Sequence, residues 1–150
     1  MTPPEFPVPK VYRAMKRDAV DGLPVVGSTT SSELGVRPGV DVTVDLADNV
    51  VPDGSGMSVA PGWRVLAETR IPKRLRSIWP GADGPNNTAC YTLGVGPFVR
   101  GMVANELELI PDGDTTPVKH GVIAPLQVVS IVQFQTDLGN TRADWQIDET

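Results

Sequence analysis

Few residues of this chain have side chains suited to chemistry. Cys90 and His120 are its only cysteine and histidine, and together they would supply a nucleophile and a base. Nothing in their spacing brings them together, and Cys90 lies in an apolar stretch where simple burial is the alternative. Glu106 and Glu108 alternate with leucines, so they are either paired carboxylates or the polar side of an exposed strand.

Arg13 is the residue that most strongly suggests a ligand. It shares one side of an alternating segment with Val11 and Met15, where an unpaired charge is costly to bury, so it needs an anionic partner. A carboxylate of the chain or a bound phosphate would both serve. The Gly/Ser-rich loop at residues 54–58 either brings backbone N–H groups to a ligand or is a plain connection. A basic run at residues 64–76 is either a solvated face or extra positive charge at the rim of such a site.

Hydrophobic periodicity predicts the strands that would position these residues. Alternation predicts a short strand at residues 10–15 and a clearer, half-buried strand at residues 40–46, where four aliphatic residues alternate with polar ones. Further strands are predicted at residues 89–93, 106–110 and 122–123.

The period changes toward the C-terminus. Ser130 opens a capping-box pattern, and Phe134, Leu138 and Trp145 then fall on one helical face. We therefore expect a C-terminal amphipathic helix that is buried against the strands. Together the elements predict an α+β fold, with a small mixed sheet and this helix.

Length and composition exclude several classes of protein. The 150 residues suffice for one domain, which we assign to residues 10–150 after an extended proline-rich arm at residues 1–9. The net charge of −5 argues against nucleic-acid binding, and a single Cys and a single His exclude a Cys/His zinc site. No apolar stretch is long enough to span a bilayer and no signal-peptide pattern opens the chain, so we expect a soluble cytoplasmic protein or one exported without a cleaved signal.

Short motifs in a particular order resemble one toxin family. They are Tyr12-Arg13-Ala14, Leu34-Gly35-Val36-Arg37-Pro38, Gly54-Ser55-Gly56-Met57-Ser58-Val59, His120-Gly121-Val122-Ile123-Ala124-Pro125, and Phe134-Gln135 with Leu138, Thr141-Arg142 and Trp145. The order resembles that of the ADP-ribosyltransferase-like toxins, whose best-known member is an effector delivered by the type VI secretion system of Pseudomonas. The match runs from about residue 11 to residue 146.

The resemblance implies a fold and a reaction. The fold would be that of NAD-using mono-ADP-ribosyltransferases, built on a split, strongly bent sheet. The reaction would be cleavage of the nicotinamide glycosidic bond of NAD, with transfer of ADP-ribose to an acceptor or to water. NAD would be a substrate, and the chemistry would involve no metal.

The resemblance also implies roles for particular residues. Ser58 would hydrogen-bond the nicotinamide ribose, and His120 would donate to the ribose or to the carboxamide. NAD would further be held by Arg13, Arg37, Tyr12 and Gly56. We therefore expect Arg13, Ser58 and His120 to converge on one cleft, and Arg13→Ala to weaken NAD binding with little loss of stability.

The chain departs from the family pattern at Ala124, where many relatives have a glutamate. Such a carboxylate would stabilise the cation that forms at the ribose, so Glu106, Glu108 and Gln135 are the residues that would replace it. The alternative function is a noncatalytic binding domain that keeps the fold. A toxin must be neutralised in the cell that makes it, so the resemblance also implies a cognate immunity protein and action on an unidentified target in the recipient cytoplasm.

Overall fold

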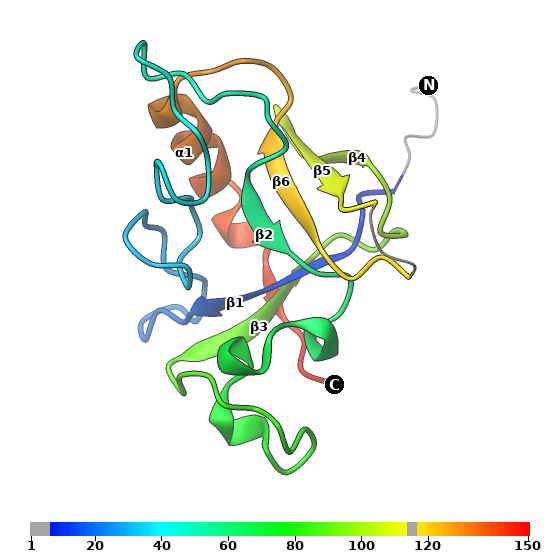
Figure 1. Ribbon diagram of the computed structural model, residues 1–150. Coiled ribbons are helices and arrows are strands. Elements are labelled where there is room, and N and C mark those ends of the chain that lie inside the picture. The colour runs from blue at the N-terminus through cyan, green and yellow to red at the C-terminus, as the bar shows by residue number, and fades with distance from the viewer. Residues whose placement is uncertain (1–6, 114–116) are drawn as a thin grey trace, which may run out of the picture.

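The computed structural model describes residues 7–113 and 117–150. In these ranges the chain forms two small antiparallel sheets and one α-helix near the C-terminus (Figure 1). The strand order is β1-β3-β7 in the first sheet and β2-β6-β5-β4 in the second. The fold is therefore α+β with a C-terminal helix, as the sequence predicts.

The first sheet is built on two strands of equal length. β1 (Val11–Lys16) pairs with β3 (Thr88–Leu93) along its whole length, and β7 (Gln146–Ile147) pairs with the other edge of β3. Val11 and Met15 enter the main hydrophobic core, while Tyr12 enters a second, smaller cluster. The predicted strand at residues 10–15 is confirmed with nearly the expected bounds.

The second sheet joins four short strands, β2 (Met57–Val59), β6 (Gly121–Pro125), β5 (Leu107–Pro111) and β4 (Gly101–Ala104). Leu107 and Leu109 are buried in the main core, whereas Glu108 points to the opposite face. This alternation is the one that the sequence predicts for a sheet with one face on the core.

The two sheets meet at one corner, where β1 and β3 cross the lower end of β2 and β6 (Figure 1). There Tyr12 and Ala60 exchange both backbone hydrogen bonds, at 2.7 and 2.9 Å. Beyond this bridge the strands diverge into their separate sheets. The divergence leaves room between β1 and β2 that a long side chain can fill.

The helix α1 (Ile131–Gly139) covers the main core. Its N-cap Ser130 accepts a hydrogen bond from the backbone N–H of Gln133 at 3.1 Å, and Phe134 and Leu138 are fully buried. The helix ends at Gly139, so it is shorter than predicted. Trp145 is buried in the same core, but it follows the 3-10 turn η4 (Arg142–Asp144). The prediction of burial is thus confirmed and the prediction of one continuous helix to Trp145 is wrong, because glycine weakens the helix at that point.

The strand predicted at residues 40–46 does not form. Val42 and Val44 make isolated bridges, whereas Val40 and Leu46 are exposed. Turns at both ends replace it: the carbonyl of Arg37 accepts the backbone N–H groups of residues 40 and 41, and Asp45 Oδ1 accepts those of residues 47 and 49.

Three 3-10 helices pack on the other side of the first sheet. They are η1 (Trp63–Val65), η2 (Glu68–Arg70) and η3 (Lys73–Leu75). The second cluster consists of Tyr12, Trp63, Ile71, Leu75, Ala82 and Cys90. In the described part of the chain no helix has both the length and the apolar composition needed to cross a membrane. Pro7–Pro9, the described end of the predicted arm, runs extended beside residues 95–96, and residues 1–6 lie outside the described ranges.

Candidate functional site

Arg13 is buried where the two sheets diverge, with only 5% of its surface exposed. Its Nε and Nη2 donate to the carbonyl of Glu33 at 3.3 and 3.0 Å, and Nη2 also donates to the carbonyl of Ser31 at 2.9 Å. Its Nη1 donates to the carbonyl of Ser58 at 2.8 Å. Among the described residues it forms no ion pair. Backbone carbonyls therefore partner this charge.

The carbonyl of Ser58 is available to Arg13 because of strand geometry. Successive backbone groups of a strand point to alternate edges, so Ser58 and Ala60 direct theirs the same way. Ala60 uses its groups to bond Tyr12 of β1, so the Ser58 carbonyl also points toward β1. Arg13 thus bridges the gap between β1 and β2.

Ser58 and His120 lie on the outer face of the second sheet. Ser58 is exposed between the buried Met57 and Val59, and it pairs with Val122 of β6. His120 precedes β6 by one residue, so alternation puts its side chain on the same face as Val122, and it is also exposed. Diagonal neighbours of this kind are typically about 7–8 Å apart in an antiparallel pair. Arg13, Ser58 and His120 therefore come from three distant segments to one corner of the molecule.

Positive charge is concentrated around Arg13. Arg70 also donates to the Ser31 carbonyl, at 3.1 Å, and Arg37 is held by Asp41 through Nε and Nη2. Burial, and then the neighbouring charge of Arg70, lower the pKa of Arg13 to about 10, against the opposing charge of Asp41. Arg13 is still a cation at neutral pH, and of these three arginines only Arg37 is paired with a described carboxylate.

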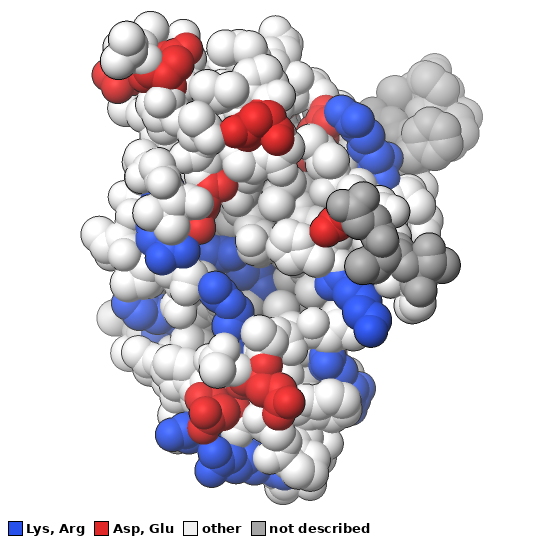
Figure 2. All heavy atoms as spheres, in the orientation of Figure 1, with Lys and Arg blue, Asp and Glu red and all other residues white. Residues whose placement is uncertain are grey.

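Figure 2 shows where this charge reaches the surface. Lys and Arg atoms gather in and around a hollow across the middle of the drawn face, with acidic groups above and below it. The hollow lies over the corner between β1 and β2 seen in Figure 1. In a protein of net charge −5, a local concentration of positive charge such as this one would attract an anion.

Glu108 is the carboxylate that the sheet places nearest to the departure from the family pattern. It lies directly opposite Ala124 in the β5–β6 pairing, and its Oε1 accepts from Arg100 Nη2 at 2.7 Å. Glu108 and Ala124 line a cavity of about 320 Å³ together with residues of the loop at 50–55. A larger, mostly apolar cavity of about 770 Å³, between Pro7–Pro9 and β4, contains none of the predicted site residues.

Tyr12 points away from the guanidinium, and Gly56 is a close-packing position. Tyr12 points to the opposite side of β1, where its hydroxyl donates to Asp148 at 2.6 Å. A Cβ on Gly56 would lie 2.4 Å from the carbonyl oxygen of Ile123, so glycine is needed there for close packing of β2 on β6. Both positions shape the fold around the site.

The remaining candidates lie elsewhere. Cys90 is fully buried, and burial, followed by the charge of Glu149, raises the pKa of its thiol to about 12, so it is protonated at neutral pH. Glu106 has a left-handed φ of 63° in the turn before β5, so it does not share a strand face with Glu108. Gln135 is bonded to both backbone groups of residue 36.

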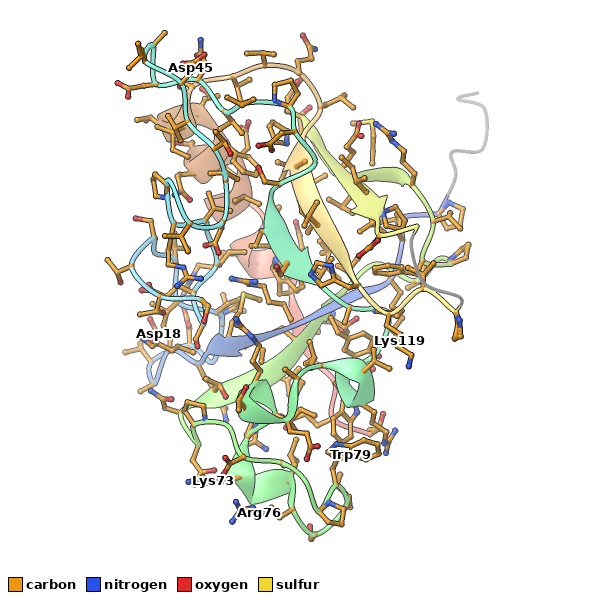
Figure 3. The ribbon with its side chains drawn as sticks, viewed as in Figure 1. Asp18, Asp45, Lys73, Arg76, Trp79 and Lys119 are labelled. Atoms are coloured by element: carbon orange, nitrogen blue, oxygen red, sulfur yellow. The ribbon has the colours of Figure 1, made fainter. Side chains whose placement is uncertain are left out.

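The basic run at residues 64–76 does not form one surface. Arg74 pairs with Glu149, while Lys73 and Arg76 both pair with Asp83. Figure 3 shows Lys73 and Arg76 at the end of the molecule, away from β2. Arg70 alone of this run reaches Arg13. Sequence reasoning grouped Arg70 with its neighbours, because no local pattern singles it out.

Comparison of the chain with protein-family models, with curated proteins and with solved structures gives no match. In residues 7–113 and 117–150 no group of three or more His, Cys, Asp or Glu side chains is arranged to hold a metal ion.

Proposed function

We propose that this chain is a toxin of the ADP-ribosyltransferase-like class that cleaves NAD and transfers ADP-ribose to an acceptor in a target cell. The observation that supports it is the link between Arg13 and the Ser58 carbonyl, at a corner that also carries His120. These are the residues to which the family resemblance assigns the central roles. Arg13 and Ser58 lie on separate segments, so their contact does not follow from local sequence.

The side chains have the chemistry that the reaction needs. Breaking the nicotinamide bond leaves positive charge on the ribose, and the ribose must be held while nicotinamide departs. The exposed hydroxyl of Ser58 makes no hydrogen bond with the described residues, so it can donate to the ribose. The imidazole of His120, exposed on the same face, can donate to the ribose or to the carboxamide.

A carboxylate would stabilise the ribose cation, and Glu108 is the one best placed to supply it. It lies across from Ala124, where cross-strand Cβ atoms are typically about 5 Å apart. The small methyl group of Ala124 leaves space above it for the longer glutamate. In this proposal Glu108 leaves its ion pair with Arg100 when NAD binds, and its carboxylate then faces the positive charge that develops on the ribose.

The test is release of nicotinamide from NAD by the purified protein. Ser58→Ala should lower the rate by about 10- to 100-fold, the loss expected for one hydrogen bond made in the transition state. Its melting temperature should not change, because the hydroxyl has no partner among the described residues. Ser77→Ala, an exposed serine beyond η3, is the matched control and should behave like the parent. Glu108→Gln in the same assay tests the carboxylate.

A noncatalytic binding domain is the second candidate, and Ala124 favours it because the expected carboxylate is absent from β6. The two functions differ in one measurement. Calorimetric binding of NAD without release of nicotinamide, by the parent protein, would support the binding domain and contradict the enzyme.

The toxin proposal includes a partner and a place of action. Expression in a host cytoplasm should stop growth, and Ser58→Ala should restore it. A cognate immunity protein would be identified as a co-expressed protein that restores growth without altering the amount of toxin.

A further inference from the structure

The carbonyl oxygen of Ser31 joins two arginines. It accepts from Arg13 Nη2 at 2.9 Å and from Arg70 Nη1 at 3.1 Å, so the two donor nitrogens are at most about 6 Å apart. Two like charges repel at this distance, more strongly where one is buried. One carbonyl, a partial negative charge, offsets only part of the repulsion. The pair therefore concentrates positive charge that a bound anion would offset.

Two other arginines of these segments have carboxylate partners, whereas Arg13 and Arg70 have none among the described residues. Arg37 forms an ion pair with Asp41, and Arg74 forms one with Glu149. Neither Arg13 nor Arg70 forms an ion pair with any residue of the described ranges. Arg70 uses one nitrogen on Ser31, and its other donors have no hydrogen bond to described residues.

The two arginines differ in exposure, which gives them different roles toward a ligand. Arg13 is fixed and almost fully buried, while Arg70 is half-buried at the end of η2. Arg70 can thus contact a ligand from solvent while Arg13 supplies charge from beneath. The hollow with blue atoms in Figure 2 lies over this corner.

We propose that Arg70, together with Arg13, forms a binding site for a pyrophosphate-class dianion, and that Arg70 rather than Arg37 is its main side-chain contact. The identity of the natural ligand as NAD rests on the proposed function. The anion site itself rests on the Ser31 geometry. The two donor nitrogens lie at most about 6 Å apart, so the two linked phosphates of one ligand can contact both cations together, and their two negative charges offset both positive ones.

The experiment is calorimetric titration with inorganic pyrophosphate and, separately, with orthophosphate. Arg70→Ala should weaken pyrophosphate binding by about tenfold or more, since a charge-assisted contact is lost. Arg64→Ala is the matched control, because Arg64 is an exposed arginine of the same run that contacts the Trp63 ring. It should reduce the affinity less than twofold.

A melting measurement on the same variants separates binding from structure. Arg70→Ala should melt at the parent temperature or above it, because Ser31 keeps its bond from Arg13 and the repulsion is removed. A clearly lower melting temperature would mean that Arg70 is structural, and would overturn the proposal.

Three binding outcomes would also overturn it: no pyrophosphate binding by the parent, equal affinity for orthophosphate, or equal weakening by Arg64→Ala and Arg70→Ala. Pyrophosphate binding that depends on Arg70, in a protein that releases no nicotinamide, would uphold the anion site and reject the proposed enzyme. NAD cleavage with an unchanged KM in Arg70→Ala would support the enzyme and reject the role of Arg70.

Discussion

Replacing Arg13 by alanine should destabilise the fold by about 3 kcal/mol. The guanidinium satisfies the carbonyls of Glu33 and Ser58, and both lose these donors in the variant, whereas Ser31 keeps Arg70. One buried and one partly buried acceptor left without donors cost about 2–5 kcal/mol. The loss of the buried stem beside Val11 and Met15 adds about 1–2 kcal/mol.

One effect opposes this loss. Removing the Arg13 charge ends its repulsion with Arg70, about 2–3 kcal/mol at roughly 6 Å and an effective dielectric constant near 20. The sum leaves about 3 kcal/mol of destabilisation. The sequence suggests that Arg13→Ala costs little stability, whereas from these contacts we expect the opposite. The reason is that the acceptors left without a donor are carbonyls of the protein itself.

The assay is thermal and urea unfolding followed by circular dichroism. For a domain of this size the melting temperature should fall by about 6–12 °C. Arg17→Ala, an exposed arginine next to the end of β1, is the control and should shift it by less than about 2 °C. A melting temperature of Arg13→Ala within the range of that control would refute the reasoning. If Arg13→Ala is destabilised as expected, loss of its activity alone says little about catalysis, and Ser58→Ala is the cleaner test.

Two further predictions concern the C-terminal segment. Trp145→Ala should cost about 3–5 kcal/mol, because Trp145 is 1% exposed and its Nε1 donates to Thr141 Oγ1 at 2.9 Å; an unchanged urea midpoint would contradict this. Hydrogen bonds from Tyr12 and Thr150 lower the pKa of Asp148 to about 2, below its ordinary value of 3.8. The ionised carboxylate therefore stabilises the fold above pH 4, and this contribution is lost as the pH falls from 4 to 2. Asp148→Asn should lower the free energy of unfolding by about 1 kcal/mol at pH 6, after allowance for the partial exposure of the carboxylate. The stability of the variant should also fall less steeply between pH 4 and pH 2. Parallel stability–pH curves for parent and variant would reject the assignment.

Elements defined by a local rule were predictable from sequence. β5 follows from the alternation of Leu107 and Leu109 with glutamates, β1 from a shorter and less regular pattern, and α1 begins where Ser130 caps it. In each case the information lies within a few neighbouring residues, so no knowledge of the partner strand is needed. Two features were not predictable in this way: where α1 ends, and that no strand forms at residues 40–46. Both depend on whether a turn is more stable than another residue of helix or strand at that point. Turns at both ends decided the second, and alternation alone does not reveal them.

Strands that exist only through pairing could not be predicted. β2 is three residues long inside a Gly/Ser-rich stretch, and it is a strand because β6 lies beside it. The same holds for the position of Glu108 across from Ala124, which depends on the register of β5 on β6. Register is set by the buried faces of both strands together, so neither segment encodes it by itself.

For the site, the sequence by itself indicated that Arg13 shares a strand side with Val11 and Met15 and needs a partner if that side is buried, because burying a lone charge is costly wherever it occurs. It left open which side of the strand is the core, and the structure buries both. Only the tertiary structure decided that the partners are carbonyls of Ser31, Glu33 and Ser58. It likewise separated Arg70 from the other basic residues of its run. Electrostatic interactions act through space, and distances between charges on different segments are fixed only when the sheets have packed.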